Sequence, residues 1–423
     1  MIRLRPETDV DLRCPTCEAE LEPRGWLVPG MRNVADLFCT GCARTYYGDL
    51  PSGFGLLYPC LVDCSSGEIH DLYGGPWFAE WLREAWTNRH STPWPLSIEK
   101  HDEVRAPLLL NCLDGLYGHS LLKLLNAQHY LDRHTHRDLI VIVSRNLRWL
   151  VPDGVAEIWT VDIGPREARG WNDWFAAAVA ERLADFPELF LSVAVPHPDP
   201  ADYDIERFTR TAPKPTVSPP GEPPVVTFAW RGDRTWHPRS SGRSEKRALA
   251  QLARCLRSQL GSVDFAVCGL GERTRIDGVA DIRDPAPDSV VELDWCQRYA
   301  ASDVIVGVHG SNMLLPSAHA LAAVELVPND RLGNVAQSLL VRGDDLRDVL
   351  FRYRLLPLAS SPAVVAAVVA AVIENRPGAA VTFSRRWTDH EIVSRDLSGP
   401  RRARQARTDD GGDVETGGRR RWR

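Results

Sequence analysis

A short polar turn in the second half of the chain has the residue types that phosphate binding needs. His309, Gly310, Ser311 and Asn312 stand between an apolar run, residues 303–308, and a leucine-rich stretch. This order predicts a buried strand, a turn and a helix of a parallel α/β sheet. Backbone N–H groups at the start of such a helix bind anions, and a glycine lets the ligand approach closely. The turn is therefore a predicted phosphate site, with Ser311 or Asn312 as the helix cap.

Two arginines and a glutamate extend this site. Arg231 and Arg234 follow a second apolar run, residues 225–230, and arginine binds phosphate through two parallel hydrogen bonds. Glu325 ends the strand after the turn, where it either accepts hydrogen bonds from a ribose or faces solvent. Ligands of parallel sheets bind in the crevice beyond the carboxyl ends of the strands. We therefore expect these side chains to face a common crevice.

Four cysteines predict a metal site near the N-terminus, at Cys14-x-x-Cys17 and Cys39-x-x-Cys42. Two such turns place four thiolates around one ion, which is the ligand set of structural zinc. Four cysteines leave no open coordination position, so a catalytic role is not expected. A segment of this size buries too little apolar surface to fold alone, and zinc would stabilise it. We predict a zinc ribbon over residues 1–70.

The elements that must position these residues alternate between strands and helices. Apolar runs predict strands at 106–112, 138–144, 155–161, 225–230, 263–268, 303–308 and up to 328, and periodic stretches predict helices at 117–131, 171–182, 245–260, 289–301 and 361–374. The alternation indicates an α/β protein with two doubly wound halves, separated by the proline-rich segment 199–224. We predict Rossmann-like lobes over 71–210 and 211–396 and a disordered tail over 397–423.

The composition is that of a soluble globular protein. Apolar residues make up 44% and charged residues 25% of the 423-residue chain. A net charge of -6 argues against a generally cationic nucleic-acid binder. The longest apolar run, 363–373, is about half of what a bilayer crossing needs, and the N-terminus carries no export signal. We expect a cytoplasmic protein without a membrane span.

Two tryptophans could contribute to recognition. Trp77 and Trp81 are one helical turn apart and share a face. They form either an aromatic platform for a sugar or part of the packing between the ribbon and the next domain, and we favour packing because large aromatic side chains dominate such contacts.

The spacing of the glycines after the predicted strands helps to distinguish between possible nucleotide ligands. An enzyme that binds a dinucleotide or a methyl donor usually has Gly-x-Gly-x-x-Gly directly after its first strand. Gly269-Leu270-Gly271 is followed by Glu-Arg-Thr-Arg, which matches this pattern poorly. The arginines and the polar turn suit a nucleotide sugar better. A Rossmann-type methyltransferase with a zinc ribbon and a non-catalytic binding module of the same fold remain as alternatives.

The stretch around the polar turn resembles a known family. Asp303-Val-Ile-Val-Gly-Val-His309-Gly-Ser-Asn-Met-Leu-Leu, ending in Ala323-Val-Glu325-Leu-Val-Pro328, is similar to the family 61 glycosyltransferases. Their pattern is an apolar strand, His-Gly-Ala-Gly, a leucine-rich helix and an apolar strand ending in Glu-Leu. The resemblance implies the two-lobed GT-B fold and the transfer of a hexose or pentose from a nucleotide sugar to a carbohydrate or other hydroxyl acceptor.

The resemblance also assigns roles. It implies inversion at the anomeric carbon without a metal, with residues 309–312 and Glu325 at the donor and the arginines near 231–243 at its phosphates. A second stretch, Gly115-Leu-Tyr-Gly-His119-Ser-Leu-Leu-Lys123, is similar to the family's Tyr-x-His-x-Leu-x-Asp-x-Leu element, with Lys123 where the family has an acid.

Inverting transfer needs a base for the acceptor hydroxyl. Asp114 and His119 are our candidates, because they follow the end of a predicted strand in the first lobe. A single histidine at the start of a leucine-rich helix is also often a structural residue.

Overall fold

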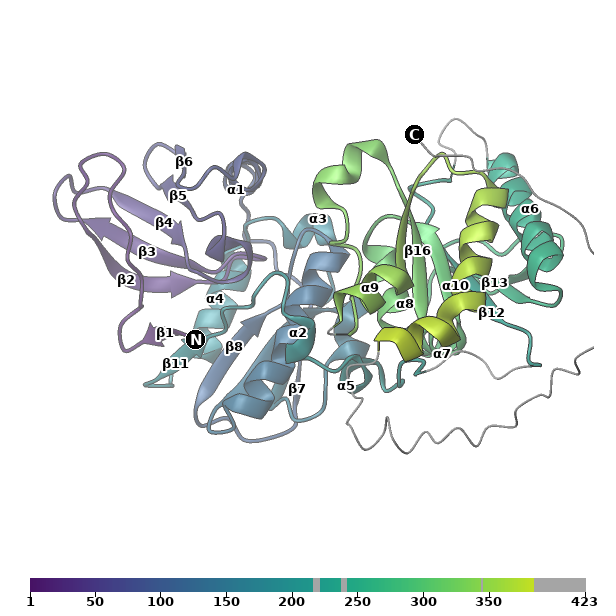
Figure 1. Cartoon of the computed structure of the whole chain (residues 1–423). Helices are drawn as coiled ribbons and strands as arrows, with labels where there is room; N and C mark the ends of the chain where they lie inside the picture. The colour runs from purple at the N-terminus through teal and green to yellow at the C-terminus, as the bar shows by residue number, and fades with distance from the viewer. Residues whose placement is uncertain (216–220, 237–241, 344, 384–423) are drawn as a thin grey trace, which may run out of the picture.

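The computed structural model describes residues 1–215, 221–236, 242–343 and 345–383, so the predicted tail lies outside it. Three sheets follow one another along the described chain, flanked by helices (Figure 1). The predicted mixed α/β architecture is confirmed. None of the helices in the described residues combines the length and apolar character that a membrane crossing requires.

The first sheet is an antiparallel meander at one end of the molecule. Its five strands pair in chain order: β2 (Leu21–Leu27), β3 (Val34–Cys39), β4 (Thr45–Asp49), β5 (Cys60–Asp63) and β6 (Ile69–Asp71). A short 3-10 helix, η1 (Gly53–Leu56), lies between β4 and β5, and helix α1 (Pro76–Thr87) leads from β6 to the next sheet. Its apolar side chains share one core with the second sheet, including Leu37, Tyr46, Leu109 and Ile142. The small module is therefore packed onto its neighbour and buries little surface by itself.

The second sheet is parallel at its centre and antiparallel at both edges, in the order β1-β11-β8-β9-β10-β7. Its strands are β1 (Ile2–Arg5), β7 (Leu96–Lys100), β8 (Pro107–Asn111), β9 (Asp138–Ser144), β10 (Glu157–Val161) and β11 (Leu189–Leu191). Its helical segments are α2 (Tyr117–Arg133), η2 (Arg145–Leu150), α3 (Pro165–Ala168) and α4 (Asp173–Arg182). The domain boundaries stay a prediction, but β1 pairs with β11 of this sheet although the sequence assigned its residues to the ribbon.

The third sheet is parallel throughout, in the order β14-β13-β12-β15-β16-β17. Its strands are β12 (Val225–Trp230), β13 (Asp264–Gly269), β14 (Ala280–Asp281), β15 (Val304–Val308), β16 (Ala322–Val327) and β17 (Tyr353–Pro357). The order reverses between β12 and β15, which is the switch point where such sheets bind ligands. Its helical segments are α6 (Gly242–Leu260), α7 (Ser289–Ala301), η4 (Ser311–Met313), α8 (Leu314–His319), η5 (Asn329–Asn334), α9 (Leu346–Arg352) and α10 (Pro362–Phe383).

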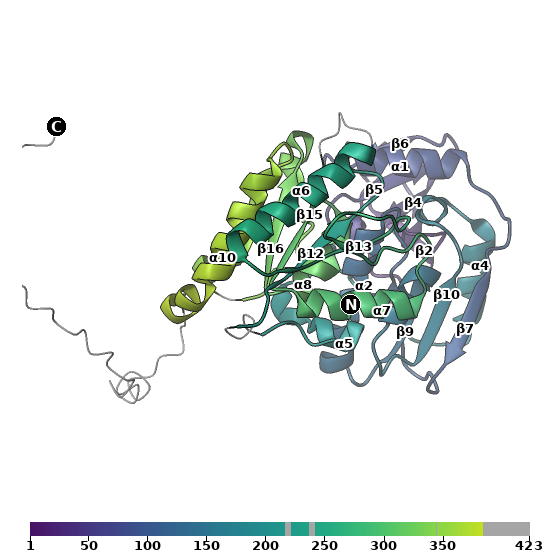
Figure 2. The same ribbon diagram turned by 90° about the vertical axis from the view of Figure 1, so that its right-hand side faces the viewer.

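Helices cover both faces of the third sheet. Helices α6 and α10 lie side by side on one face (Figure 2), where their apolar residues pack on Val226 and Phe228 of β12. Helices α7 and α8 pack on the other face, against Ala229 and Ile305. Strands β12 and β15 are buried on both sides, which explains why their sequences are continuous apolar runs.

The two larger lobes meet through a common core. Apolar residues of α2 in the first lobe and of α7 and α8 in the second belong to one cluster, including Leu121, Trp295 and Leu314. The proline-rich segment between the lobes is partly folded, because it contains η3 (Pro200–Asp202) and α5 (Ile205–Thr209). Phe208 of α5 is fully buried in the same core. The described part of this segment is therefore docked onto the lobes and is more than a connection between them.

Candidate functional site

The four predicted zinc ligands come together. The sulfur atoms of Cys14, Cys17, Cys39 and Cys42 all lie within 4.8 Å of one another, with 3.6 Å between Cys14 and Cys42 and 3.4 Å between Cys17 and Cys39. Zinc–sulfur bonds of about 2.3 Å in a tetrahedron separate the sulfurs by about 3.8 Å. The four thiols therefore fit a metal ion of this kind and would enclose it completely.

The polar turn joins β15 to two short helical segments. Gly310 has a φ of 147°, and a β-carbon there would collide with the guanidinium of Arg231. Neither Ser311 nor Asn312 caps a helix, so that expectation was wrong. Asn312 instead donates to the carbonyl of Ala229 at 3.3 Å, which ties the turn to β12. The helix is broken into η4 and a six-residue α8, so its N-terminus offers little to an anion.

Two arginines supply the positive charge at this turn. Arg231 and Arg234 both donate to the carbonyl oxygen of His309, at 3.2 and 3.0 Å. Arg231 also donates to the side chain of Asn312 at 3.3 Å and forms a two-bonded ion pair with Asp233. Burial and the charge of Arg231 lower the pKa of Arg234. Two guanidinium groups so close together favour a bound anion.

Glu325 lies behind the turn and does not face solvent. Its side chain is 0% exposed, and one carboxylate oxygen accepts a hydrogen bond from Ser338 and lies 3.3 Å from Nδ1 of His309. The other oxygen is buried without a partner. The Ser338 hydroxyl donates its proton to Glu325, so it accepts from His309 Nδ1 at 3.0 Å. Glu325 thus orients the His309 ring and, in this structure, is shielded from a ribose in the crevice.

The two catalytic candidates form a buried polar group at the end of β8. Asp114 lies 3.1 Å from Nδ1 of His119 through one oxygen and 2.9 Å from the ammonium of Lys123 through the other. Burial raises the pKa of Asp114, but Lys123 and His119 outweigh it and lower the value to about 2. Lys123 also donates to the carbonyls of Leu113 and Met31, at 2.8 and 3.4 Å. The lysine at the acidic position of the motif thus keeps Asp114 ionised.

The ribbon module contacts this group directly. Phe54 of η1 packs against His119 with 4.4 Å between ring centroids and 47° between the ring planes, and Trp77 packs edge-on against Phe54 at 5.3 Å. Trp77 and Trp81 also pack against each other at 5.0 Å. The rings fill the junction between ribbon and lobe, as the packing interpretation expected, although Trp77 remains 37% exposed.

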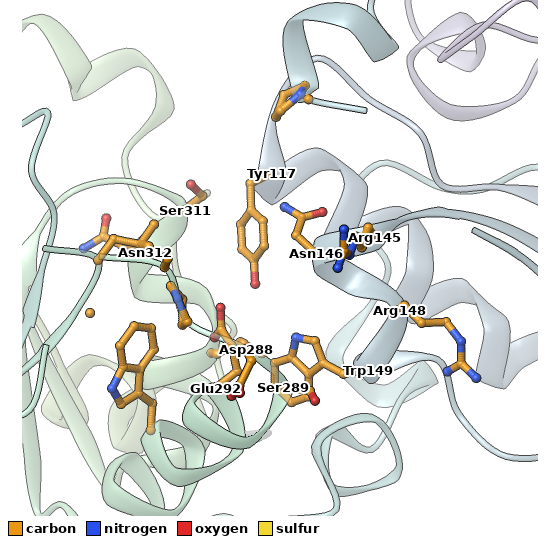
Figure 3. A pocket seen from close by; sticks show the side chains of 18 of the residues that line it. Tyr117, Arg145, Asn146, Arg148, Trp149, Asp288, Ser289, Glu292, Ser311 and Asn312 are labelled. Carbon is orange, nitrogen blue, oxygen red and sulfur yellow. The ribbon is translucent and has the colours of Figure 1, made fainter. Parts of the chain in front are cut away.

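A cavity of ≈ 1340 Å³ lies between the two larger lobes (Figure 3). Three predicted site residues line it, namely Arg231, Ser311 and Asn312. The other six do not: Asp114, His119, Arg234, His309, Gly310 and Glu325. The cavity lies beyond the carboxyl ends of β9, β10, β12, β13 and β15, whereas His119 comes after β8 and Glu325 lies within β16.

The two groups of residues meet where the lobes touch. A β-carbon on Gly118 would lie 2.8 Å from Cβ of Ser311, so the start of α2 presses against the donor turn. His119 therefore directly follows Gly118, which contacts Ser311 in the cavity wall. Sequence spacing alone could not show this, because it depends on how the lobes dock.

Several cavity residues were not predicted. Tyr117 and Glu292 come from opposite lobes, and Figure 3 shows the Tyr117 ring between the two walls with its hydroxyl directed toward α7. Asp288 caps α7 by accepting from the backbone N–H groups of Val290 and Val291, both at 3.0 Å. Asp288 before a helix was a recognisable cap. Nothing in the sequence indicated which side of α7 would face the cavity.

Comparisons with known proteins include a distant similarity to a solved structure. No protein-family model matches the chain, and no curated protein matches it. A solved structure of ADP-heptose LPS heptosyltransferase II from E. coli is similar, at 13% identity, over 64% of this chain and 99% of that chain, with a TM-score of 0.38. Similarity at this level leaves the activity to be argued from the site itself.

Proposed function

We propose that the protein is a glycosyltransferase of the two-lobed GT-B type that moves a sugar from a nucleotide sugar to a hydroxyl acceptor. The observation that carries the proposal is the cavity between the lobes, where Arg231, Ser311 and Asn312 border one continuous space. The cavity is large enough for a nucleotide and part of an acceptor together.

The donor's diphosphate would lie against Arg231 and the Ser311 turn. Arg231 comes from the end of β12 and the turn from the end of β15, on either side of the switch point of the sheet. Charge builds up on the diphosphate as the sugar leaves. The guanidinium group of Arg231 would stabilise that charge directly, and Arg234, which shares the carbonyl of His309 with it, would add positive charge from behind the cavity wall.

The acceptor's proton would pass to His119. In an inverting transfer the hydroxyl attacks from the face opposite the leaving diphosphate, and a base takes its proton. His119 is on the lobe opposite Arg231, next to the contact between Gly118 and Ser311. Asp114, ionised at any physiological pH, would orient the ring through Nδ1 and stabilise the imidazolium that forms.

Nucleotide binding tests this function. We expect ribonucleoside diphosphates, screened as a panel, to raise the melting temperature of the full chain. Arg231→Ala should abolish the increase. Arg273→Ala is the matched control, because Arg273 lies in the same lobe, pairs with Asp284 at 3.8 Å and does not line the cavity. Release of the nucleoside diphosphate from a panel of nucleotide sugars then identifies the donor.

Three outcomes would contradict the proposal. One is the absence of a thermal shift with every nucleoside diphosphate. Another is an undiminished shift in Arg231→Ala. The third is stabilisation by S-adenosylmethionine alone, which would favour a methyltransferase.

A further inference from the structure

One half-buried carboxyl group in the cavity lacks a partner among the described residues. Glu292 lies in the first turn of α7 and lines the cavity. Within the described residues its carboxylate makes no hydrogen bond or ion pair. Most other carboxylates of the cavity wall are engaged: Asp233 with Arg231, Asp288 with two backbone N–H groups, Glu99 with Arg148 and Asp162 with Arg145. A half-buried carboxylate without a donor is costly unless a ligand provides one.

The groups around Glu292 cannot neutralise it. Tyr117 faces it from α2, Cys268 from β13, and Cys296 and Tyr299 from its own helix. Burial raises the pKa of all four, so they are uncharged near neutral pH. Burial also raises the pKa of Glu292 to about 7. The site offers a hydrogen-bond acceptor and lacks a positive charge, so it suits a neutral ligand with hydroxyl donors.

The cavity is polarised along the second lobe. Arg231, which is paired with Asp233, and the Ser311 turn form a side rich in hydrogen-bond donors, whereas Asp288 and Glu292 form a side rich in acceptors. Leu270, which is 55% exposed, and Pro287 add apolar surface next to the acidic side. The groups of a nucleotide follow a matching order: an anionic phosphate, then a ribose with two neighbouring hydroxyls as hydrogen-bond donors, then a flat base. A ligand with its phosphates on Arg231 would bring its nucleoside toward α7.

We propose that Glu292 is the residue that binds the ribose of the donor, by accepting hydrogen bonds from its 2′- and 3′-hydroxyl groups. This rests on the proposed function and moves the ribose contact from Glu325, which is buried behind His309, to α7. Glu292 belongs to the same lobe as Arg231, so one rigid body would hold both the phosphates and the ribose. A base for the acceptor has to come from the opposite side of the donor, where His119 lies.

Analogues without ribose hydroxyls test the assignment. The probe is the ribonucleoside diphosphate that binds best in the panel, compared with its 2′,3′-dideoxy form by calorimetry on the full chain. In the wild type we expect the dideoxy form to bind at least about tenfold more weakly, as two lost hydrogen bonds to a charged group imply. In Glu292→Gln and Glu292→Ala the two ligands should bind within about twofold of each other.

The control variant is Asp294→Asn, which changes an exposed carboxyl on the same helix and should keep the wild-type discrimination. Equal binding of the two ligands by the wild type would overturn the ribose assignment while leaving the proposed function intact. Retention of the discrimination in both Glu292 variants would do the same. Failure of every ribonucleoside diphosphate to bind the wild type would instead overturn the proposed function.

Discussion

At the scale of single residues, the candidate site consists of polar side chains that are oriented by ion pairs and hydrogen bonds with other polar side chains. Asp114 pairs with both His119 and Lys123, and Glu325 reaches His309 directly and through Ser338. Asp114, Lys123, His309 and Glu325 are buried, and removing one charged partner there leaves the other without compensation. Variants that remove one partner should lose both stability and activity, whereas variants that remove both partners should recover stability but not activity.

The pair of Asp114 and Lys123 makes the first prediction. Asp114→Asn leaves the Lys123 ammonium buried without its counter-ion, so the free energy of unfolding should fall by about 3 kcal/mol. The double variant Asp114→Asn, Lys123→Met should recover most of this loss because neither charge remains. Transfer activity should stay low in both, since the His119 ring has lost its carboxylate. Urea unfolding and activity assays check this, and full activity in the double variant would show that Asp114 is purely structural.

The raised pKa of Glu292 makes the second prediction. The folded state favours the protonated carboxyl, so folding becomes less favourable as pH rises from the unfolded value near 4.5 to about 7. Glu292→Gln removes that cost, which is roughly 2 kcal/mol after allowance for partial exposure. The variant should melt a few degrees above the wild type at pH 8 and at the same temperature at pH 4.5, by differential scanning calorimetry without ligand. A constant difference across this pH range would contradict the pKa assignment.

At the scale of elements, the start of α2 and the donor turn form one of the contacts between the two lobes. Gly118 allows this contact because it has no side chain. The turn is tied to β12 by Asn312 and to β15 by the chain itself, so it cannot withdraw without disturbing the sheet.

Gly118→Ala makes the third prediction. The new methyl group would lie 2.8 Å from Cβ of Ser311 and 3.2 Å from Leu314, so α2 and the turn must move apart. Alanine favours the helix, so the fold should survive. We expect turnover to fall by about tenfold or more, because a misplacement of about 1 Å is costly in catalysis. Gly333→Ala, at a position with nothing within 4 Å, should behave as the wild type in the same kinetic assay.

At the scale of the whole molecule, the ribbon and the first lobe fold as one unit. Their apolar residues form a single core, and Asn111 at the end of β8 donates to the carbonyl of Gly30 at 2.8 Å. Met31 and Phe54 then contact the residues around His119. The ribbon therefore packs against one side of the group formed by Asp114, His119 and Lys123.

Removal of the metal makes the fourth prediction. Metal analysis should find about one zinc per chain, and a strong chelator should lower the melting temperature by several degrees. Transfer activity should fall with it, because Phe54 and Met31 lose their positions. Nucleotide binding to the second lobe should persist in chelated protein that remains folded. Unchanged activity after complete loss of zinc would show that the ribbon does not support the site.

The sequence by itself determined the local features. Strands such as 138–144 and 225–230 and the helix 289–301 were predicted with their observed bounds, because each depends on apolar runs, caps and turns within a short stretch. The CxxC spacing likewise brought four thiols together. These properties are set by neighbours in the chain.

The tertiary structure decided which side chains share a space. Glu325 was predicted at the ligand and is buried behind His309, while Glu292 was not predicted and lines the cavity. The strands β7 and β11, and the pairing of β1 with β11, were also absent from the prediction. The positions of Glu325 and Glu292 depend on contacts between residues far apart in sequence. These contacts are the docking of α2 against the donor turn and the packing that leaves one side of α7 free. A one-dimensional pattern of apolar and polar residues contains neither, because each depends on which residues of the other lobe come to lie against these helices.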